Sequence, residues 1–185
     1  WVAAVWQRQG DAFGLVVCIG GKVEFTQAAR GPRQLQRVLA QLSKARPEGV
    51  LPTAEVLKAH LHFARSPSLI FAVGDSLEWP SPLSEALLRL RKLRHDVRLL
   101  TLRTQAEVDA SFKSGAGYRD PEQSGGLHRM SNRDRDSYKL QSRVHFDGVA
   151  SSCRQNNIIH HEARIEQALG SVLRSWLRLA GARAG

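Results

Sequence analysis

Thr53 and Asp75 carry the oxygen-bearing side chains whose positions in the sequence most favour chemistry. Asp75 directly follows a short apolar run, residues 68–73, and Thr53 stands at the head of a helical pattern. In open α/β sheets, ligand sites form where loops leave the carboxyl ends of strands. A hydroxyl and a carboxylate are hard oxygen ligands of the kind that Mg²⁺ or Mn²⁺ accepts. We therefore expect Thr53 and Asp75 to contribute to a metal site, and Ser76 to join them in a partner-binding surface.

Each of these residues also has a simpler structural interpretation. A threonine before a helix is a good N-cap, and capping by Thr53 is compatible with a second role in binding. Asp75 could satisfy the amides of the turn that follows its strand. The same holds for His145 on a long predicted helix, where a hydrogen bond near the sheet is a simpler role than catalysis.

The four residues from Gly74 to Leu77 also match the signature of the GDSL lipases and esterases, in which the serine is a nucleophile. Such a serine needs a general base and oxyanion donors, which that family takes from an Asp-x-x-His motif and a Gly-x-Asn-Asp block. Neither motif occurs in this sequence. A serine hydrolase is therefore the main enzyme alternative, and the sequence favours a protein that is not an enzyme.

The histidines and cysteines do not form a recognisable zinc-binding pattern. His60 and His62 are two residues apart on a predicted helix, and His160 and His161 are adjacent on a predicted strand, so each pair points in different directions. Cys18 and Cys153 belong to no CxxC pair, which favours buried, reduced thiols in a cytoplasmic protein.

The formal net charge of +10 suggests a nucleic-acid or anionic membrane partner as a second class of function. The densest basic stretch comprises Arg89, Arg91, Lys92, Arg94, Arg98 and Arg103. A leucine stripe fills the opposite positions of the same helix, namely Leu83, Leu87, Leu90 and Leu93. This pattern is typical of a solvated face above a buried stripe, and no aromatic residues interleave to stack on bases.

Hydrophobic periodicity predicts an α/β fold with a mostly parallel sheet flanked by helices. The expected strands are residues 12–19 and 22–26, joined as an antiparallel edge hairpin at Gly20-Gly21, then 68–73, 97–102 and 158–159. The expected helices are the opening residues up to Gly10, then 35–42, a helix from Thr53 through Leu61 and Ala64, 83–94, 134–155 and a last one bearing Trp176. A loop or small hairpin is expected at 115–126. We expect one domain over residues 1–180 and a flexible tail at 181–185.

Several segments resemble, in order and spacing, the bacterial family called domain of unknown function 58. They are residues 10–16, 30–35, 51–53 and 68–75, followed by 95–98, 118–121 and the helix with Tyr138, His145 and Cys153. The family is similar to von Willebrand A domains. The resemblance implies a non-catalytic module that partners a MoxR-type AAA+ ATPase in the assembly or activation of other proteins.

The same resemblance implies a metal-ion-dependent adhesion site, to which Thr53 and Asp75 correspond residue by residue. Its Asp-x-Ser-x-Ser motif does not occur here, and the central strand that would carry it is expected to precede Trp1. Its loss would leave two strand edges without their common neighbour and an incomplete set of ligands. Mg²⁺ or Mn²⁺ is therefore expected in the full-length protein, which could be anchored to the inner membrane, and not in this chain alone.

Overall fold

The computed structural model of the chain describes residues 2–46, 49–60, 66–113, 115–118, 127–129 and 131–178. The chain divides into two compact units, residues 1–65 and 66–185. The single domain over residues 1–180 stays a prediction, and the tail at 181–185 lies outside the described residues. None of the helices within the described residues combines the length and apolar character needed to cross a bilayer.

The first unit is built on an antiparallel hairpin, which confirms the prediction made from Gly20-Gly21. Strand β1 (Phe13–Ile19) pairs with β2 (Lys22–Ala29), and the two turn glycines have φ of 58° and 72°. Left-handed backbone at both central positions is the geometry that two-residue hairpins require. Helix α1 (Val2–Gln9) precedes the hairpin and ends at Gly10, as predicted.

Helices α2 (Pro32–Lys44) and α3 (Ala54–His60) complete the first unit. Gln34, on the first turn of α2, is buried, and its amide donates to the carbonyl of Phe13 at 2.7 Å and to that of Gln27 at 2.8 Å. One side chain thereby satisfies backbone acceptors of both hairpin strands and fixes the start of α2 against them. The predicted continuation of α3 through Leu61 and Ala64 lies outside the described residues.

The second unit contains a three-stranded parallel sheet in the order β3-β4-β7. Its strands are β3 (Leu69–Gly74), β4 (Asp96–Arg103) and β7 (Ile159–Arg164). Helix α4 (Pro82–Lys92) connects β3 to β4 and begins in a capping box formed by Ser81 and Ser84, with proline at the first helical position. The predicted strand-helix-strand crossover and its capping serine are confirmed.

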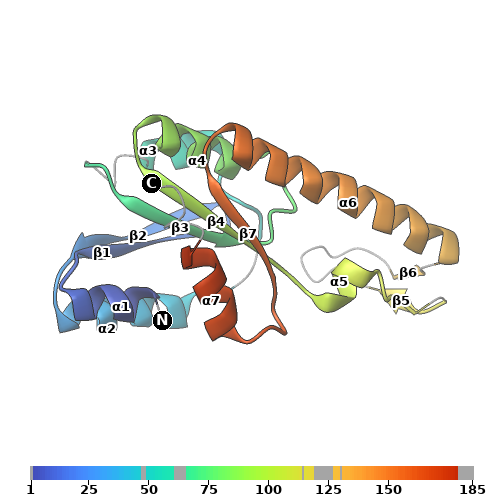
Figure 1. The fold of residues 1–185 in the computed structure, drawn as a ribbon, viewed down its shortest axis with the longest axis horizontal. Helices are drawn as coiled ribbons and strands as arrows, with labels where there is room; N and C mark the ends of the chain where they lie inside the picture. The colour runs from blue at the N-terminus through green and yellow to red at the C-terminus, as the bar shows by residue number, and fades with distance from the viewer. Residues whose placement is uncertain are drawn as a thin grey trace. The chain divides into compact units, whose positions relative to one another are not determined.

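Helices cover both faces of this sheet, as Figure 1 shows. Helix α4 and the long helix α6 (Asn132–Gln155) lie on one side, and α7 (Leu169–Arg178) lies on the other. Between α7 and the sheet, a buried cluster contains Leu100 and Ala163 of the strands and Val172 and Trp176 of α7. Helix α5 (Gln105–Asp109) follows β4, and β5 (Gly117–Tyr118) pairs antiparallel with β6 (His128–Arg129). Of the two alternatives expected for residues 115–126, a loop or a small hairpin, this pairing favours the hairpin, with its second strand beyond the predicted range.

Three details of the sequence interpretation are wrong. Leu93 does not belong to the buried stripe, because α4 ends at Lys92 and the capping Leu93 is 54% exposed. The apolar pattern that predicts the last helix also includes Ile165, but this residue lies before α7 and is exposed, since the chain turns there between β7 and the helix. The last strand has six residues, where two were expected, because the polar run after Ile159 continues the pairing with β4.

The protein is therefore a mixed α/β protein with a parallel sheet flanked by helices and a separate antiparallel hairpin. The hairpin and the parallel sheet belong to different units, so the prediction that the hairpin forms an edge of that sheet stays a prediction. Strand β4 is central and buried along almost its whole length, whereas β3 lies at an edge. The carboxyl ends of β3 and β4 meet at the same rim, where Gly74 is paired with Thr101.

Candidate functional site

The loop that follows β3 presents an exposed carboxylate on a fixed backbone. The Asp75 side chain accepts a hydrogen bond from the amide of Leu77 at 3.0 Å, and the residue remains exposed. Between them, Ser76 has φ of 58°, which is uncommon for a residue other than glycine. Such a conformation persists where surrounding contacts hold it, and two contacts of Ser76 do so here.

The hydroxyl and the carbonyl of Ser76 are both hydrogen-bonded to other elements of the second unit. Its hydroxyl lies 2.8 Å from the hydroxyl of Thr101 on β4, and Thr101 in turn lies 2.9 Å from Nε2 of His160 on β7. The Ser76 carbonyl accepts from Nε2 of His145 on α6 at 2.8 Å. Thr101 is fully buried, with 0% exposure. Strands β4 and β7 and helix α6 thus hold the loop after β3 in place.

Burial lowers the pKa of His160 below the ordinary value for histidine. The carboxylate of Glu162 acts in the opposite direction, and His161 and Arg154 lower the pKa further by repulsion. A neutral imidazole, whose Nε2 can accept a hydrogen bond from the Thr101 hydroxyl, is therefore favoured near neutral pH. The hydrogen bonds that lead from Ser76 to Thr101 can therefore continue to an acceptor, Nε2 of His160.

The lowered pKa of His160 predicts a loss of stability in acid. The unfolded chain takes up its proton near pH 6.5, whereas the folded protein does so only at lower pH. The free energy of unfolding should therefore fall as pH decreases from about 6.5 through the folded pKa. Urea unfolding at several pH values should show a flatter profile for His160→Gln. His60→Gln, which changes a histidine of the first unit, is the control for the substitution itself.

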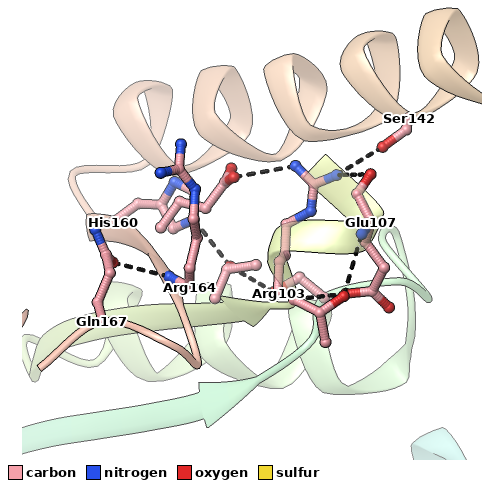
Figure 2. A network of polar contacts seen from close by, with 10 residues as sticks. Arg103, Glu107, Ser142, His160, Arg164 and Gln167 are labelled. Atoms are coloured by element: carbon pink, nitrogen blue, oxygen red, sulfur yellow. Dashed lines mark hydrogen bonds and ion pairs between the residues drawn. The ribbon is translucent and has the colours of Figure 1, made fainter. Parts of the chain in front are cut away.

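Arg103 stands at the end of β4, on the same face of the sheet as Thr101. Its side chain links β4 to β7 and α6 (Figure 2). Its guanidinium donates to Glu162 on β7 at 3.0 Å and to the hydroxyl of Ser142 on α6 at 2.8 Å. It also lies 3.8 Å from the centre of the Phe146 ring. The buried charge is compensated by a carboxylate, hydrogen bonds and an aromatic face, so this network supports the rim next to His160.

The predicted basic patch is only partly at the surface. Arg98 is 8% exposed, pairs with Asp96 at 3.0 Å and faces the ring of Phe71. Arg91 donates to the carbonyls of His95 and Asn157. The members of the stretch that are exposed are Arg89, Lys92 and Arg94.

Thr53 lies in the first unit and Asp75 in the second, so their convergence stays a prediction. The Thr53 carbonyl accepts the first helical hydrogen bond of α3, from the amide of Leu57 at 3.0 Å, which places the residue in the capping position. The pKa of Glu55 is lowered by its own backbone amide and then by the Thr53 side chain. The exposed Thr53 hydroxyl therefore lies close to an acidic side chain.

Within the described parts of the chain, no three side chains of histidine, cysteine, aspartate or glutamate gather as a metal-binding group. His60 Nδ1 donates to the carbonyl of Val56, and His62 lies outside the described residues. Burial raises the pKa of Cys18, and it raises that of Cys153 to about 11, so both thiols are protonated at neutral pH. The donor set visible in the second unit, a single aspartate at the rim, does not by itself complete a magnesium site.

No family model matches the chain, and neither does a curated protein or a solved structure. The site therefore has to be judged on its own residues. The sequence singled out Asp75, Ser76 and His145, and the structure brings them into one loop and its contacts. Sequence reasoning missed Thr101 and Ser142, and it placed Arg103 only in the basic stretch. A threonine between leucines in a predicted buried strand was the one signal that could have pointed to the first of these.

Proposed function

We propose that this protein is a non-catalytic interaction module of the von Willebrand A type, which docks a protein partner at the loop after β3. One observation carries the proposal, namely that the exposed Asp75 carboxylate stands on a loop held by Ser76 through β4 and α6. A preorganised loop of this kind loses little conformational freedom on binding. An exposed carboxylate at its tip offers electrostatic selectivity for a partner.

The contacts of Ser76 support docking over ester hydrolysis. A nucleophilic serine needs its hydroxyl within hydrogen-bonding reach of a general base. The Ser76 hydroxyl instead bonds to Thr101, while His145 bonds to the serine's carbonyl oxygen. His160 is linked to the hydroxyl through the intervening Thr101. The arrangement positions the loop, and a fluorophosphonate probe that labels Ser76 would contradict this assignment.

The resemblance of the sequence supports a MoxR-type AAA+ ATPase as the partner. In that view, Thr53 and Asp75 belong to one docking surface, to which Mg²⁺ or Mn²⁺ binds in the whole protein. The described residues of the second unit supply only Asp75 as a ligand for such a metal. The docking proposal therefore rests on the loop and does not require a bound metal.

Removing the Asp75 carboxylate should weaken binding of a purified MoxR-type AAA+ ATPase from the same organism. We expect Asp75→Ala and Asp75→Asn to raise Kd at least roughly tenfold, because a charged contact worth about 1.4 kcal/mol is lost. The asparagine retains an oxygen that can accept from Leu77, so it separates charge from loop geometry. Biolayer interferometry measures both.

Asp136→Asn, an exposed carboxylate on α6, serves as the matched control and should bind normally. Unchanged affinity in both Asp75 variants would exclude the loop as the docking surface. In the whole protein, Mg²⁺ should raise Tm through binding to the folded state, and Asp75→Ala should not respond. If neither Mg²⁺ nor Mn²⁺ changes the Tm of the whole protein, the proposed metal is excluded. The docking loop is then tested by the binding measurement alone.

A further inference from the structure

The chain of hydrogen bonds from Ser76 to His160 has a direction that depends on one proton. A hydroxyl group has a single hydrogen to donate, and a protonated imidazole donates from both nitrogens. When Nε2 of His160 carries no proton, Thr101 donates to it and is left to accept from Ser76. When Nε2 carries a proton, Thr101 must accept from it, and its own hydrogen then goes to Ser76. The distances of 2.8 and 2.9 Å allow both directions.

We infer that the neutral ring of His160 carries its hydrogen on Nδ1, and that protonation of Nε2 changes which hydrogen-bonding group Ser76 offers to a partner at the docking loop. With Nε2 unprotonated, the Ser76 hydrogen is used in the bond to Thr101, and the oxygen lone pairs remain for a ligand. Next to the Asp75 carboxylate, this makes two acceptors side by side, which fit an arginine or lysine side chain of the partner. With the imidazolium, Ser76 accepts from Thr101 and presents its hydrogen to the ligand, which opposes a cationic group.

Burial makes this coupling effective. Thr101 is fully buried, so water cannot supply the hydrogen bonds that one direction of the chain would lose. The Ser76 carbonyl is unaffected, because Nε2 of His145 donates to it whether that ring is neutral or charged. The loop therefore keeps its position while the polarity of the Ser76 hydroxyl changes.

Charged groups from three elements surround His160. Glu162 on its own strand favours the imidazolium, but that carboxylate is already bonded to Arg103 on β4. Arg154 on α6 and His161 on β7 oppose the added charge, together with burial. The neutral ring therefore predominates at neutral pH, and the change of polarity falls on the acid side of histidine's ordinary pKa. This regulation rests on the proposed docking function of the loop.

Nuclear magnetic resonance of the complete chain tests the coupling without any partner. Between about pH 7.5 and about pH 5, the ring ¹⁵N shifts of His160 and the amide shift of Ser76 should follow one midpoint. Thr101→Val should abolish the Ser76 response while His160 still titrates, and Thr101→Ser, which restores the hydroxyl, should retain it. His160→Gln should abolish the response from the other end of the chain, which covers the case of a valine variant that does not fold.

A Ser76 amide that ignores the titration of His160, or that responds equally in Thr101→Val, would overturn the inference. Binding of the AAA+ ATPase at the same pH values separates it from the docking proposal. Affinity should fall with acidity in the wild type and in Thr101→Ser, and the fall should be smaller in His160→Gln. If Asp75→Ala abolishes binding but His160→Gln keeps the wild-type pH profile, the docking function stands and the polarity change does not.

Discussion

Replacing Trp176 with alanine is expected to lower the free energy of unfolding by about 3–5 kcal/mol. The side chain is 1% exposed and packs with Leu100, Ala163 and Val172 between α7 and the sheet. Its ring meets that of Phe71 edge to face, with centroids 4.7 Å apart. Alanine would leave a cavity that the surrounding strands cannot close and would remove the aromatic pair. Urea unfolding followed by circular dichroism measures the loss.

Trp176→Phe is the matched control. The indole nitrogen is buried and has no hydrogen-bond partner among the described residues, so phenylalanine removes volume but no hydrogen bond. We expect a cost of about 1–2 kcal/mol, well below that of alanine. If alanine and phenylalanine cost the same, or if alanine costs less than about 1 kcal/mol, α7 does not pack on the sheet as described.

Replacing Arg103 with alanine is the second large perturbation, with an expected loss of about 2–4 kcal/mol. The substitution removes the ion pair with Glu162, the hydrogen bond to Ser142 and the stacking on Phe146. It also leaves a carboxylate without its partner near the sheet. The Glu162 side chain is 36% exposed, so water compensates part of that loss, and the effect stays below that of a fully buried pair.

Arg103→Lys separates charge from geometry. Lysine keeps the positive charge but lacks the planar fork that reaches Glu162 and Ser142 together and stacks on the ring. An intermediate cost of about 1–2 kcal/mol is expected for it. Pairing Arg103→Ala with Glu162→Gln in a double-mutant cycle isolates the ion pair from the other contacts. Equal costs for alanine and lysine would mean that the fork and the ring contact contribute nothing.

Local patterns in the sequence were sufficient for most of the secondary structure. Gly20-Gly21 predicted the hairpin because few other residues adopt left-handed backbone twice in succession. Ser81-Pro82 predicted the start of α4 because a capping hydroxyl and a proline both suit the first turn. The valine and leucines within 97–102 predicted a buried strand, and β4 is the central one. Each of these signals involves only a few neighbouring residues, so it predicts local structure without knowledge of the fold.

The residues at the rim formed by the carboxyl ends of β3 and β4 were predicted only in part. A carboxylate after a strand pointed to Asp75 and Ser76, and the structure shows both on the loop after β3. The prediction that Thr53 joins them depends on long-range placement. Arg98 was assigned to a basic surface because its neighbours are charged, yet β4 is covered on both faces, and Asp96 and the ring of Phe71 compensate the buried charge. Charge density along a sequence does not tell whether other elements cover a strand.

The sequence by itself thus determined the order of strands and helices, the turns and caps between them, and the exposed carboxylate after β3. Only the tertiary structure decided that Ser76, Thr101 and His160 form one chain, because Thr101 and His160 are 59 residues apart and meet through parallel strand pairing. It also decided that Arg103 is buried, since Glu162, Ser142 and Phe146 compensate its charge from other elements. Burial of a polar group is favourable only where distant partners converge on it, and that convergence is a property of the fold.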